Sequence, residues 1–427
     1  MGILVSVVFV VSILLAVPVG IALAVAAMVG MLYSSPEFLI VMPQKFLAGL
    51  DSFPLLAIPL FVLAGALMSK GGMARRIVDM ALVFVGRIPG GLGLVVVVSA
   101  ILFSGISGSP SANTAAIGSV ALPAMKRKRY PTDFATAIFA AAGGVSTLIP
   151  PAIDLIVIGV VGGMSIGMLF AAGVLPGLAF GLAVMALTYF YAVKLELPLE
   201  DPQPLREKLR VVGDGLLPIG MIAIILGGIY GGVFTPTEAS SVAVVYGFIV
   251  SFFIYREITF EDLPPLLLRT AALTGVVMLV LATASVFSFV LTFERIPHAL
   301  AAWITQTAPN WLLFMLLVHV VFLVLGMVMD ALPPIIILMP ILVPVAVTLG
   351  MDPVHFGILI AANVGIGMIS PPVGICLYVA CGISDTTIEA VTPRLMPYLV
   401  TLLAMLIVIT IFPSITLFLP RLLGYAG

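Results

Sequence analysis

The chain has 427 residues, of which 62% are hydrophobic and 9% are charged, and its formal net charge is −1. Soluble domains carry roughly 45–50% apolar and about 25% charged residues, so this composition excludes a cytosolic enzyme and a nucleic-acid-binding protein. It leaves room for many crossings of about 20 apolar residues each, which is typical of a polytopic helical protein in a lipid bilayer.

Long apolar stretches argue against an outer-membrane barrel, whose strands alternate polar and apolar side chains. Residues 55–68 and 399–412, for example, are mostly apolar throughout. The first apolar stretch runs for roughly thirty residues without the basic n-region of a signal peptide, and we interpret it as a kinked span broken at Pro18. In chain order, the predicted spans are 3–33, 54–69, 134–162, 166–193, 215–233, 236–254, 270–293, 356–383 and 395–419.

Two less regular regions, 91–125 and 311–349, lie between these spans. If each enters and leaves on the same side, the loops that share one side hold 15 of the 18 Lys and Arg residues. The positive-inside rule makes that side cytoplasmic. We therefore predict two re-entrant hairpins, the first open from the cytoplasm and the second from outside. The basic loops are 70–90, 126–133, 194–214, 255–269 and 384–394, and the opposite side keeps Lys45, Arg295 and Arg421.

The two halves of the chain repeat each other. In each half, a hairpin is followed by a short loop, a helix, a Pro-Pro break and another helix. Because the charge partition puts the halves in opposite orientation, we interpret them as an inverted repeat. The matches are Pro150-Pro151 with Pro371-Pro372 and Pro123 with Pro344, 221 residues apart, and Gly143 with Gly365 and Pro131-Thr-Asp-Phe134 with Pro353-Val-His-Phe356, 222 residues apart.

The predicted fold class is therefore an all-α polytopic membrane protein with an inverted repeat, two re-entrant hairpins and broken helices at 134–162 and 356–383. Inverted repeats with broken helices are typical of secondary transporters, which bind their substrate at the repeat interface. The predicted organisation is an N-terminal scaffold helix and connecting segment (1–53), a first repeat (54–193), a central connecting loop with scaffold helices (194–269) and a second repeat (270–427).

The first hairpin carries the most polar stretch of the apolar region. Six of the eleven residues from Ser104 to Thr114 have polar side chains. Hydroxyls and carbonyls freed by Gly and Pro are the hard oxygen ligands that a small cation needs, and the positive end of a helix starting near Asn113 would attract an anion. The alternative is a run of small residues that eases helix packing.

Both Pro-Pro breaks follow a Gly-rich, hydroxyl-containing run. A Pro-Pro pair removes two backbone donors and frees carbonyls one turn earlier, which again provides cation ligands. A purely structural kink is the alternative. The two runs are Gly143-Gly-Val-Ser146-Thr147-Leu-Ile-Pro150-Pro151 and Asn363-Val-Gly365-Ile-Gly367-Met-Ile-Ser370-Pro371-Pro372.

Carboxylates within apolar stretches are functional candidates, because they are costly there. Asp330 lies at the tip of the second hairpin, and its alternative is a solvated loop residue. Asp154 follows Pro150 by four residues, and its role stays open. Glu238 could instead cap the helix that follows Thr235.

The histidines and cysteines are weaker candidates. We interpret His319 as a buried, hydrogen-bonded histidine in preference to a proton relay, and we place His298 and His355 in loops. Cys376 and Cys381 are interpreted as packing residues.

Other chemistries lack their motifs. The chain has no Gly-x-x-x-x-Gly-Lys-Ser/Thr loop for ATP, and its longest hydrophilic stretch runs only from Lys194 to Asp214. Asp154 and Asp330 could in principle form the pair of a membrane aspartyl protease. Such enzymes need Tyr-Asp and Gly-x-Gly-Asp settings, whereas these residues follow Ala-Ile and Met-Val-Met. We do not expect an enzyme.

Several of these motifs together resemble the large membrane subunit of the tripartite ATP-independent periplasmic (TRAP) transporters. The resemblance implies an elevator-type fold in the bacterial inner membrane and Na⁺-coupled uptake of an organic acid, with sialic acid or a four-carbon dicarboxylate as candidates. It also implies two partners, a small four-helix membrane subunit and a soluble periplasmic substrate-binding protein. The alternative is an ion-coupled carrier that acts without a binding protein. The motifs are Ser107-Gly-Ser109, Asn113 to Gly118, Pro123-Ala-Met, Ile149-Pro-Pro151, Thr235 to Ala239 and Gly326 to Pro334.

The resemblance also implies site residues for two or more coupling Na⁺ ions. Asp330 would lie close to the second ion. Asp154 departs from the family pattern, because related chains more often have a small polar residue there, and an acid would repel a carboxylate unless it were paired or protonated. The implied residues are Ser107, Ser109, Ser146, Ile149 and Pro151 for one Na⁺, Gly326, Met329, Gly367, Ser370 and Pro372 for a second, and Ser111, Asn113, Thr114, Thr147, Asp330 and Asp154 for the substrate.

Overall fold

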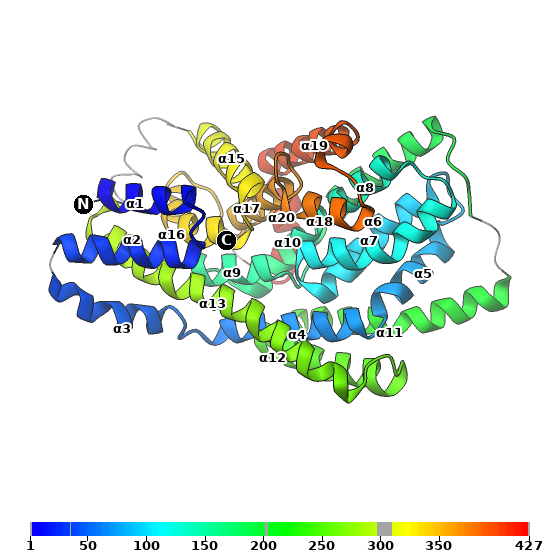
Figure 1. The fold of residues 1–427 in the computed structure, drawn as a ribbon, viewed down its shortest axis with the longest axis horizontal. Helices are drawn as coiled ribbons and strands as arrows, with labels where there is room; N and C mark the ends of the chain where they lie inside the picture. The colour runs from blue at the N-terminus through cyan, green and yellow to red at the C-terminus, as the bar shows by residue number, and fades with distance from the viewer. Residues whose placement is uncertain (1, 35, 201–203, 297–309, 426–427) are drawn as a thin grey trace.

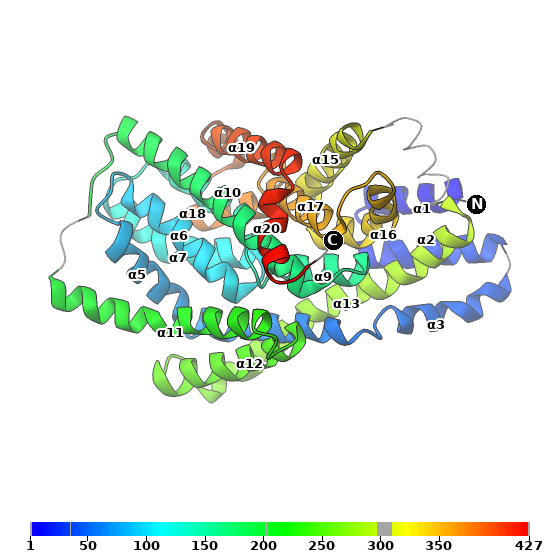
Figure 2. The same ribbon diagram turned by 180° about the vertical axis from the view of Figure 1, so that it is seen from behind.

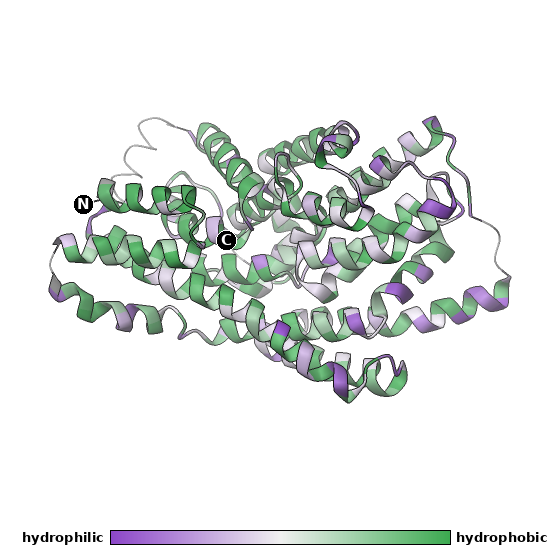
Figure 3. Cartoon of the chain, viewed as in Figure 1, coloured by the Kyte–Doolittle hydropathy of each residue, from purple (hydrophilic) through white to green (hydrophobic). Residues whose placement is uncertain are grey.

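A computed structural model describes residues 2–34, 36–200, 204–296 and 310–425 of the chain. Throughout these residues the structure is helical and contains no strand. Eight of the described helices are long and apolar enough to cross a membrane, which confirms the all-α polytopic class. Figure 3 shows hydrophobic residues along most of the helices, while many hydrophilic ones gather towards the right-hand end.

One group of helices forms the lower and left-hand part of the molecule in Figure 1. Within this outer group, α13 packs against α2, α3 and α4, and α12 packs along α4. Gly247 of α12 lets the Met68 side chain of α4 come close, since a Cβ there would lie 3.1 Å from Met68 Cγ. The outer group comprises α1 (Gly2–Leu14), α2 (Val19–Ser34), α3 (Val41–Ala48), α4 (Ala57–Lys70), α11 (Leu205–Tyr230), α12 (Pro236–Ile249) and α13 (Leu263–Phe293).

The remaining helices form the central group, which contains both Pro-Pro breaks. Two of its helices, α8 and α17, form the core, and all residues in 134–145 and 354–367 are buried. The central group comprises α5 (Met73–Val85), α6 (Gly91–Ser107), α7 (Pro110–Arg127), α8 (Thr132–Val145), α9 (Ile153–Gly162), α10 (Ile166–Lys194), α15 (Trp311–Val328), α16 (Leu332–Thr348), α17 (Pro353–Gly367), α18 (Ile375–Ser384), α19 (Ile388–Ile411) and α20 (Ser414–Leu422).

Each region predicted as a hairpin consists of two helices joined by a short turn. In Figures 1 and 2, α6–α7 and α15–α16 approach the middle of the molecule from opposite ends. The two halves of the chain also contact each other. Helix α9 of the first half packs against α16 of the second, and α18 of the second half packs against α7 of the first. Entry of the hairpins from opposite membrane faces stays a prediction, as do the proposed domain boundaries.

The N-terminal prediction was wrong. Residues 3–33 do not form one kinked span, because α1 and α2 fold back and pack against each other. Pro18 interrupts the helix, and Ala16 adopts a left-handed φ of 58° in the turn. Gly30 permits close packing, since a Cβ there would lie 2.6 Å from Val5 Cγ2.

His355 was also misplaced, because it lies in the first turn of α17 and is buried. Asp352 caps this helix and accepts hydrogen bonds from the amides of Val354 and His355 at 2.8 and 3.0 Å. An Asp-Pro pair is a recognisable helix start, so the sequence did contain this signal. His298 lies outside the described residues.

Other boundaries move towards longer helices. Helix α11 begins at Leu205, inside the predicted loop 194–214, and α13 begins at Leu263, inside the predicted loop 255–269. The predicted span 395–419 divides into α19 and α20 at Pro413. The charged first turns of α11 account for its difference, because hydropathy detects only the apolar part of a helix.

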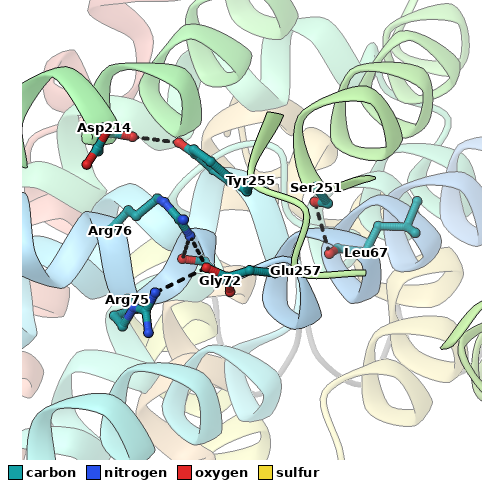
Figure 4. A network of polar contacts seen from close by, with 8 residues as sticks. All are labelled: Leu67, Gly72, Arg75, Arg76, Asp214, Ser251, Tyr255 and Glu257. Carbon is teal, nitrogen blue, oxygen red and sulfur yellow. Dashed lines mark hydrogen bonds and ion pairs between the residues drawn. The ribbon is translucent and has the colours of Figure 1, made fainter. Parts of the chain in front are cut away.

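A polar network ties α5 to the segment between α12 and α13 (Figure 4). Arg76 forms an ion pair with Glu257 at 2.7 Å, and its guanidinium lies 3.5 Å from the centre of the Tyr255 ring. The Tyr255 hydroxyl donates to the carbonyl of Asp214. Burial raises the pKa of Tyr255 to about 12, so the hydroxyl stays neutral. The network therefore joins α5 and α11 to the end of α12.

Candidate functional site

The tip of the first hairpin contacts the first Pro-Pro break. Gly108 has a left-handed φ of 62°, and its carbonyl accepts a 3.0 Å hydrogen bond from the amide of Ile153. A Cβ on Gly108 would lie 3.4 Å from the Pro151 carbonyl oxygen. The fold thus brings together the two segments that carry the first predicted Na⁺ set. Of that set, Ser107, Ser146, Ile149 and Pro151 are buried, and Ser109 is half-buried.

Sequence reasoning missed Ser104 as a residue of this junction. Its buried hydroxyl lies 2.7 Å from the carbonyl oxygen of Ser146 and 3.3 Å from that of Ile149. It therefore ties α6 to the end of α8 through the carbonyls of two residues of the first predicted Na⁺ set, each of which keeps a second lone pair for another partner. The signal was present, because Ser104 belongs to the polar stretch and precedes Ser107 by about one helical turn.

The other hydroxyls at this tip are only weakly engaged. Ser107 Oγ lies 3.4 Å from the Ser109 carbonyl oxygen, and Ser109 Oγ lies 3.4 Å from Ser111 Oγ. Well-formed hydroxyl hydrogen bonds measure roughly 2.5–3.0 Å, so these oxygens retain capacity for another partner. Hydroxyl and carbonyl oxygens are hard donors that suit a small cation, and the residues present therefore fit Na⁺.

The second hairpin makes the corresponding contact. The amide of Gly374 donates to the Met327 carbonyl at 3.1 Å, and Gly374 follows Ile153 by the same 221 residues that separate the Pro-Pro pairs. Gly326 and Gly367 touch through their backbones, since a Cβ on Gly326 would lie 2.9 Å from Gly367 Cα. The fold therefore also brings together the segments of the second predicted Na⁺ set.

The second junction is more open than the first. Asp330 and Pro372 are exposed, and Met329 is half-buried. Ser370 is buried, and its hydroxyl donates to the Ile366 carbonyl at 2.7 Å. The Asp330 carboxylate accepts a 2.8 Å hydrogen bond from the amide of Ala331.

Several predicted substrate ligands bond to nearby backbone. The Asn113 amide donates to the Ala100 carbonyl at 2.9 Å and so closes the hairpin between α7 and α6. The Thr114 hydroxyl donates to the Pro110 carbonyl at 2.9 Å, and the Thr147 hydroxyl to the Gly144 carbonyl at 3.0 Å. Ser111 is half-buried beside Ser109. These side chains shape the hairpin and the break, and their remaining lone pairs can accept a further hydrogen bond.

The two aspartates belong to one cluster. Asp154 lies in the first turn of α9 and is 3% exposed. Asp330, Asp154 and Cys376 at the start of α18 lie within electrostatic range of one another. Thr114 and Cys376 both lie beside Gly143, because a Cβ on Gly143 would overlap the Thr114 hydroxyl and lie 3.5 Å from Cys376 Cβ. Thr114, Asp154 and Asp330 therefore lie in the same part of the molecule as Cys376, a buried residue that the sequence assigned to packing.

His319 takes part in a buried hydrogen-bond network. Its Nδ1 lies 2.7 Å from Asn363 Nδ2, and its Nε2 lies 3.0 Å from Thr410 Oγ1. Thr410 donates its own hydroxyl to the Leu406 carbonyl, so Nε2 is the protonated nitrogen of a neutral ring. The prediction of a buried, hydrogen-bonded histidine is confirmed. The network joins α15, α17 and α19.

The structure also bears on the predictions made for Glu238 and for the two cysteines. Glu238 and Thr235 form a reciprocal capping box at the start of α12, with Glu238 Oε2 2.8 Å from the Thr235 amide. The capping interpretation of Glu238 is therefore confirmed. Cys376 and Cys381 are both buried and unpaired, as expected of packing residues.

Comparison with known proteins gives a consistent result. Residues 6–415 match the family model described as the DctM component of the tripartite ATP-independent periplasmic transporter. The chain is 40% identical over 403 residues to the C4-dicarboxylate TRAP transporter large permease protein DctM of Pseudomonas aeruginosa, covering 94% of both chains. It is 36% identical over 409 residues to the sialic acid TRAP transporter large permease protein SiaM of Vibrio cholerae, covering 96% of both.

A solved structure supports the fold. The YdaH transporter of Alcanivorax borkumensis matches with a TM-score of 0.61 and 14% sequence identity, and the match covers 89% of each chain. At this identity the likeness concerns the fold alone.

Proposed function

Because this chain belongs to the family of DctM components of tripartite ATP-independent periplasmic transporters, we propose that it imports an organic acid across the bacterial inner membrane and that Na⁺ drives the import. The relatives named above act on C4-dicarboxylates and on sialic acid by their names, and these are the first candidate substrates.

The observation that carries the proposal is the paired contact between hairpin tips and broken helices. The Gly108 carbonyl receives the Ile153 amide, and the Met327 carbonyl receives the Gly374 amide, at 3.0 and 3.1 Å. Each tip therefore lies against unwound backbone of its own half. Unwound backbone at membrane depth is typical of ion and substrate sites in secondary transporters.

We assign one Na⁺ to each junction. At the first, the Ser107 and Ser109 hydroxyls and the carbonyls of the Ser146–Pro151 run would hold the ion. At the second, carbonyls of the Gly326 and Gly367 segments and the Ser370 hydroxyl would do so, and the Asp330 carboxylate would balance its charge. By holding tip and break together, these residues would order the substrate site between them.

Transport would then move the central group against the outer group in an elevator motion. The first hairpin already touches the outer group, because a Cβ on Gly65 of α4 would lie 3.0 Å from both Cα and the carbonyl oxygen of Ser107. Helix α16 of the second hairpin packs against α13. Small residues at such contacts let backbones approach closely, and the re-entrant hairpins would cross the bilayer with the moving group.

Two partners complete the proposal. A small four-helix membrane subunit would accompany this chain, and a periplasmic substrate-binding protein would deliver the solute. A carrier that needs only ion coupling and no binding protein is the alternative.

Uptake by proteoliposomes tests these points together. The chain and its small subunit would be supplied with labelled succinate or N-acetylneuraminate, with and without an inward Na⁺ gradient and with and without the binding protein. We expect uptake only when both are present. Uptake that persists when choline replaces Na⁺ would refute the coupling, and uptake without the binding protein would establish the stand-alone carrier.

A further inference from the structure

Asp154 is a buried carboxylate without a partner. It is 3% exposed, and its Oδ2 has no hydrogen-bond partner among the described residues. Burial of a charge without compensating bonds is strongly unfavourable, so buried charges are normally paired or bind cations. A place in the first turn of α9 gives only the modest benefit of a helix N-terminus. Asp154 therefore requires either a proton or a positively charged ligand to compensate its charge.

A second aspartate, Asp330, makes compensation of the negative charge at Asp154 more necessary. Helices α9 and α16 pack together, and a Cβ on Gly162 would lie 3.3 Å from Met339 Cε. The end of α9 thus lies against the middle of α16, and Asp154 at the other end of α9 lies within electrostatic range of Asp330. Within the described part of the chain, neither aspartate forms an ion pair with a basic side chain.

Charge balance then restricts the solute. This step rests on the proposed function, in which two Na⁺ ions bind at the junctions. Those two ions balance the two carboxylates in net charge, so a dianion would add two uncompensated negative charges to the cluster. A solute whose carboxylate is balanced by its own positive charge would enter the cluster without a net charge. Asp154 would receive the positive group, while the hydroxyls and helix ends would receive the carboxylate.

We infer that Asp154 binds a positively charged nitrogen of the transported solute, so that the substrate is an organic acid that also carries an ammonium or amidinium group. This narrows the substrate class and disfavours simple dicarboxylates. The inference also explains why position 154 holds an acid, which would repel a solute that bears only carboxylates.

Matched ligand pairs test the inference. The pairs are succinate with aspartate, glutarate with glutamate, and propionate with β-alanine, and the members of each pair differ only by an amino group. The purified chain with its small subunit would be held in nanodiscs with Na⁺, and its thermal midpoint measured with each ligand in excess. We expect at least one amino-bearing member to raise the midpoint by about 2 °C more than its partner.

Two variants identify the group responsible. Asp154→Asn keeps the shape and removes the charge, and it should abolish the preference for the amino-bearing member, a loss of at least about tenfold in relative affinity. Asp51→Asn makes the same change at an exposed position and should leave the preference unchanged.

The remaining outcomes are decisive as well. Stabilisation by Na⁺ with no discrimination within any pair, or with preference for a nitrogen-free member, would overturn the inference but leave the proposed function standing. The inference would also be overturned if Asp154→Asn changed the Na⁺ or pH dependence of the thermal midpoint but left the ligand preference unchanged. Asp154 would then bind a coupling ion. No response to Na⁺ at all would count against the proposed function itself.

Discussion

Gly144 and Gly365 meet where the two broken helices cross. A Cβ on Gly144 would lie 2.7 Å from the carbonyl oxygen of Gly365, and a Cβ on Gly365 would overlap the Gly144 carbonyl in turn. The two residues are 221 positions apart, the spacing of the Pro-Pro pairs. At this spacing Gly144, one residue after the Gly143 that the sequence matched with Gly365, is the equivalent position, and the two glycines pack backbone to backbone in the core.

Gly365→Ala tests this crossing. The added methyl group meets backbone and the Thr147 side chain, so α8 and α17 must separate, at a cost of about 1–3 kcal/mol. We expect a lower thermal midpoint in nanodiscs and reduced uptake. Gly382→Ala is the control, because a Cβ there has no atom within 4 Å. Equal stability of the two variants would show that the close crossing is not required.

Ser104→Ala removes the hydroxyl that ties α6 to the first break. The carbonyls of Ser146 and Ile149 lose a buried donor, which costs about 1–3 kcal/mol, and the junction loses its order. We expect a lower thermal midpoint and a higher Na⁺ concentration for half-maximal uptake. Ser119→Ala is the control, because that hydroxyl is exposed and bonds within its own helix. An unchanged Na⁺ dependence would separate Ser104 from the ion site.

Ser109→Ala and Asp330→Ala should each reduce uptake strongly and leave membrane insertion intact. Ser109 also caps α7 by accepting from the Ala112 amide at 3.5 Å, so loss of the cap must be distinguished from loss of the site. Ser165→Ala provides that control, because Ser165 caps α10 in the same way at 3.4 Å. Loss of either cap costs about 1 kcal/mol. Normal uptake in both site variants would show that the site lies elsewhere.

His319 is expected to be structural. His319→Leu leaves the buried polar groups of Asn363 and Thr410 without their partner, which costs about 1–3 kcal/mol. His319→Gln restores a donor and an acceptor and should recover much of the stability together with Na⁺-driven uptake. A glutamine variant that is stable but has lost ion coupling would instead make His319 a proton relay.

Gly72→Ala tests the network that joins α5 to the α12–α13 segment. Gly72 has a φ of 73°, and a Cβ there would overlap the Glu257 carboxylate and displace its ion pair with Arg76. Gly232→Ala is the control. Gly232 has nearly the same φ of 70°, and a Cβ there has no atom within 4 Å, so this substitution measures only the backbone strain, about 1 kcal/mol. We expect a larger loss of thermal midpoint for Gly72→Ala. Equal losses would assign the whole effect to strain.

Much of the candidate site could be predicted because its signals are local. The polar run from Ser104 to Thr114 and the two Pro-Pro pairs mark interruptions in otherwise apolar helices, and the structure places turns and breaks there. Ser104 and Cys376 were not assigned to the site, since their roles depend on which distant segment lies opposite. The N-terminal error has the same origin, because hydropathy cannot distinguish a kinked span from two helices that fold back.

The sequence by itself determined the membrane class, the helical breaks and the repeat, because these follow from the transfer of apolar residues into lipid and from backbone donors that proline removes. The tertiary structure alone decided that Gly144 meets Gly365, that Ser104 bonds to the first break and that Asp154 is buried without a hydrogen-bond partner for its Oδ2 among the described residues. The physical reason is that lipid-facing and buried helix faces are both apolar. Helix partners are therefore chosen by close packing of small residues and by buried hydrogen bonds, and these depend on the whole fold.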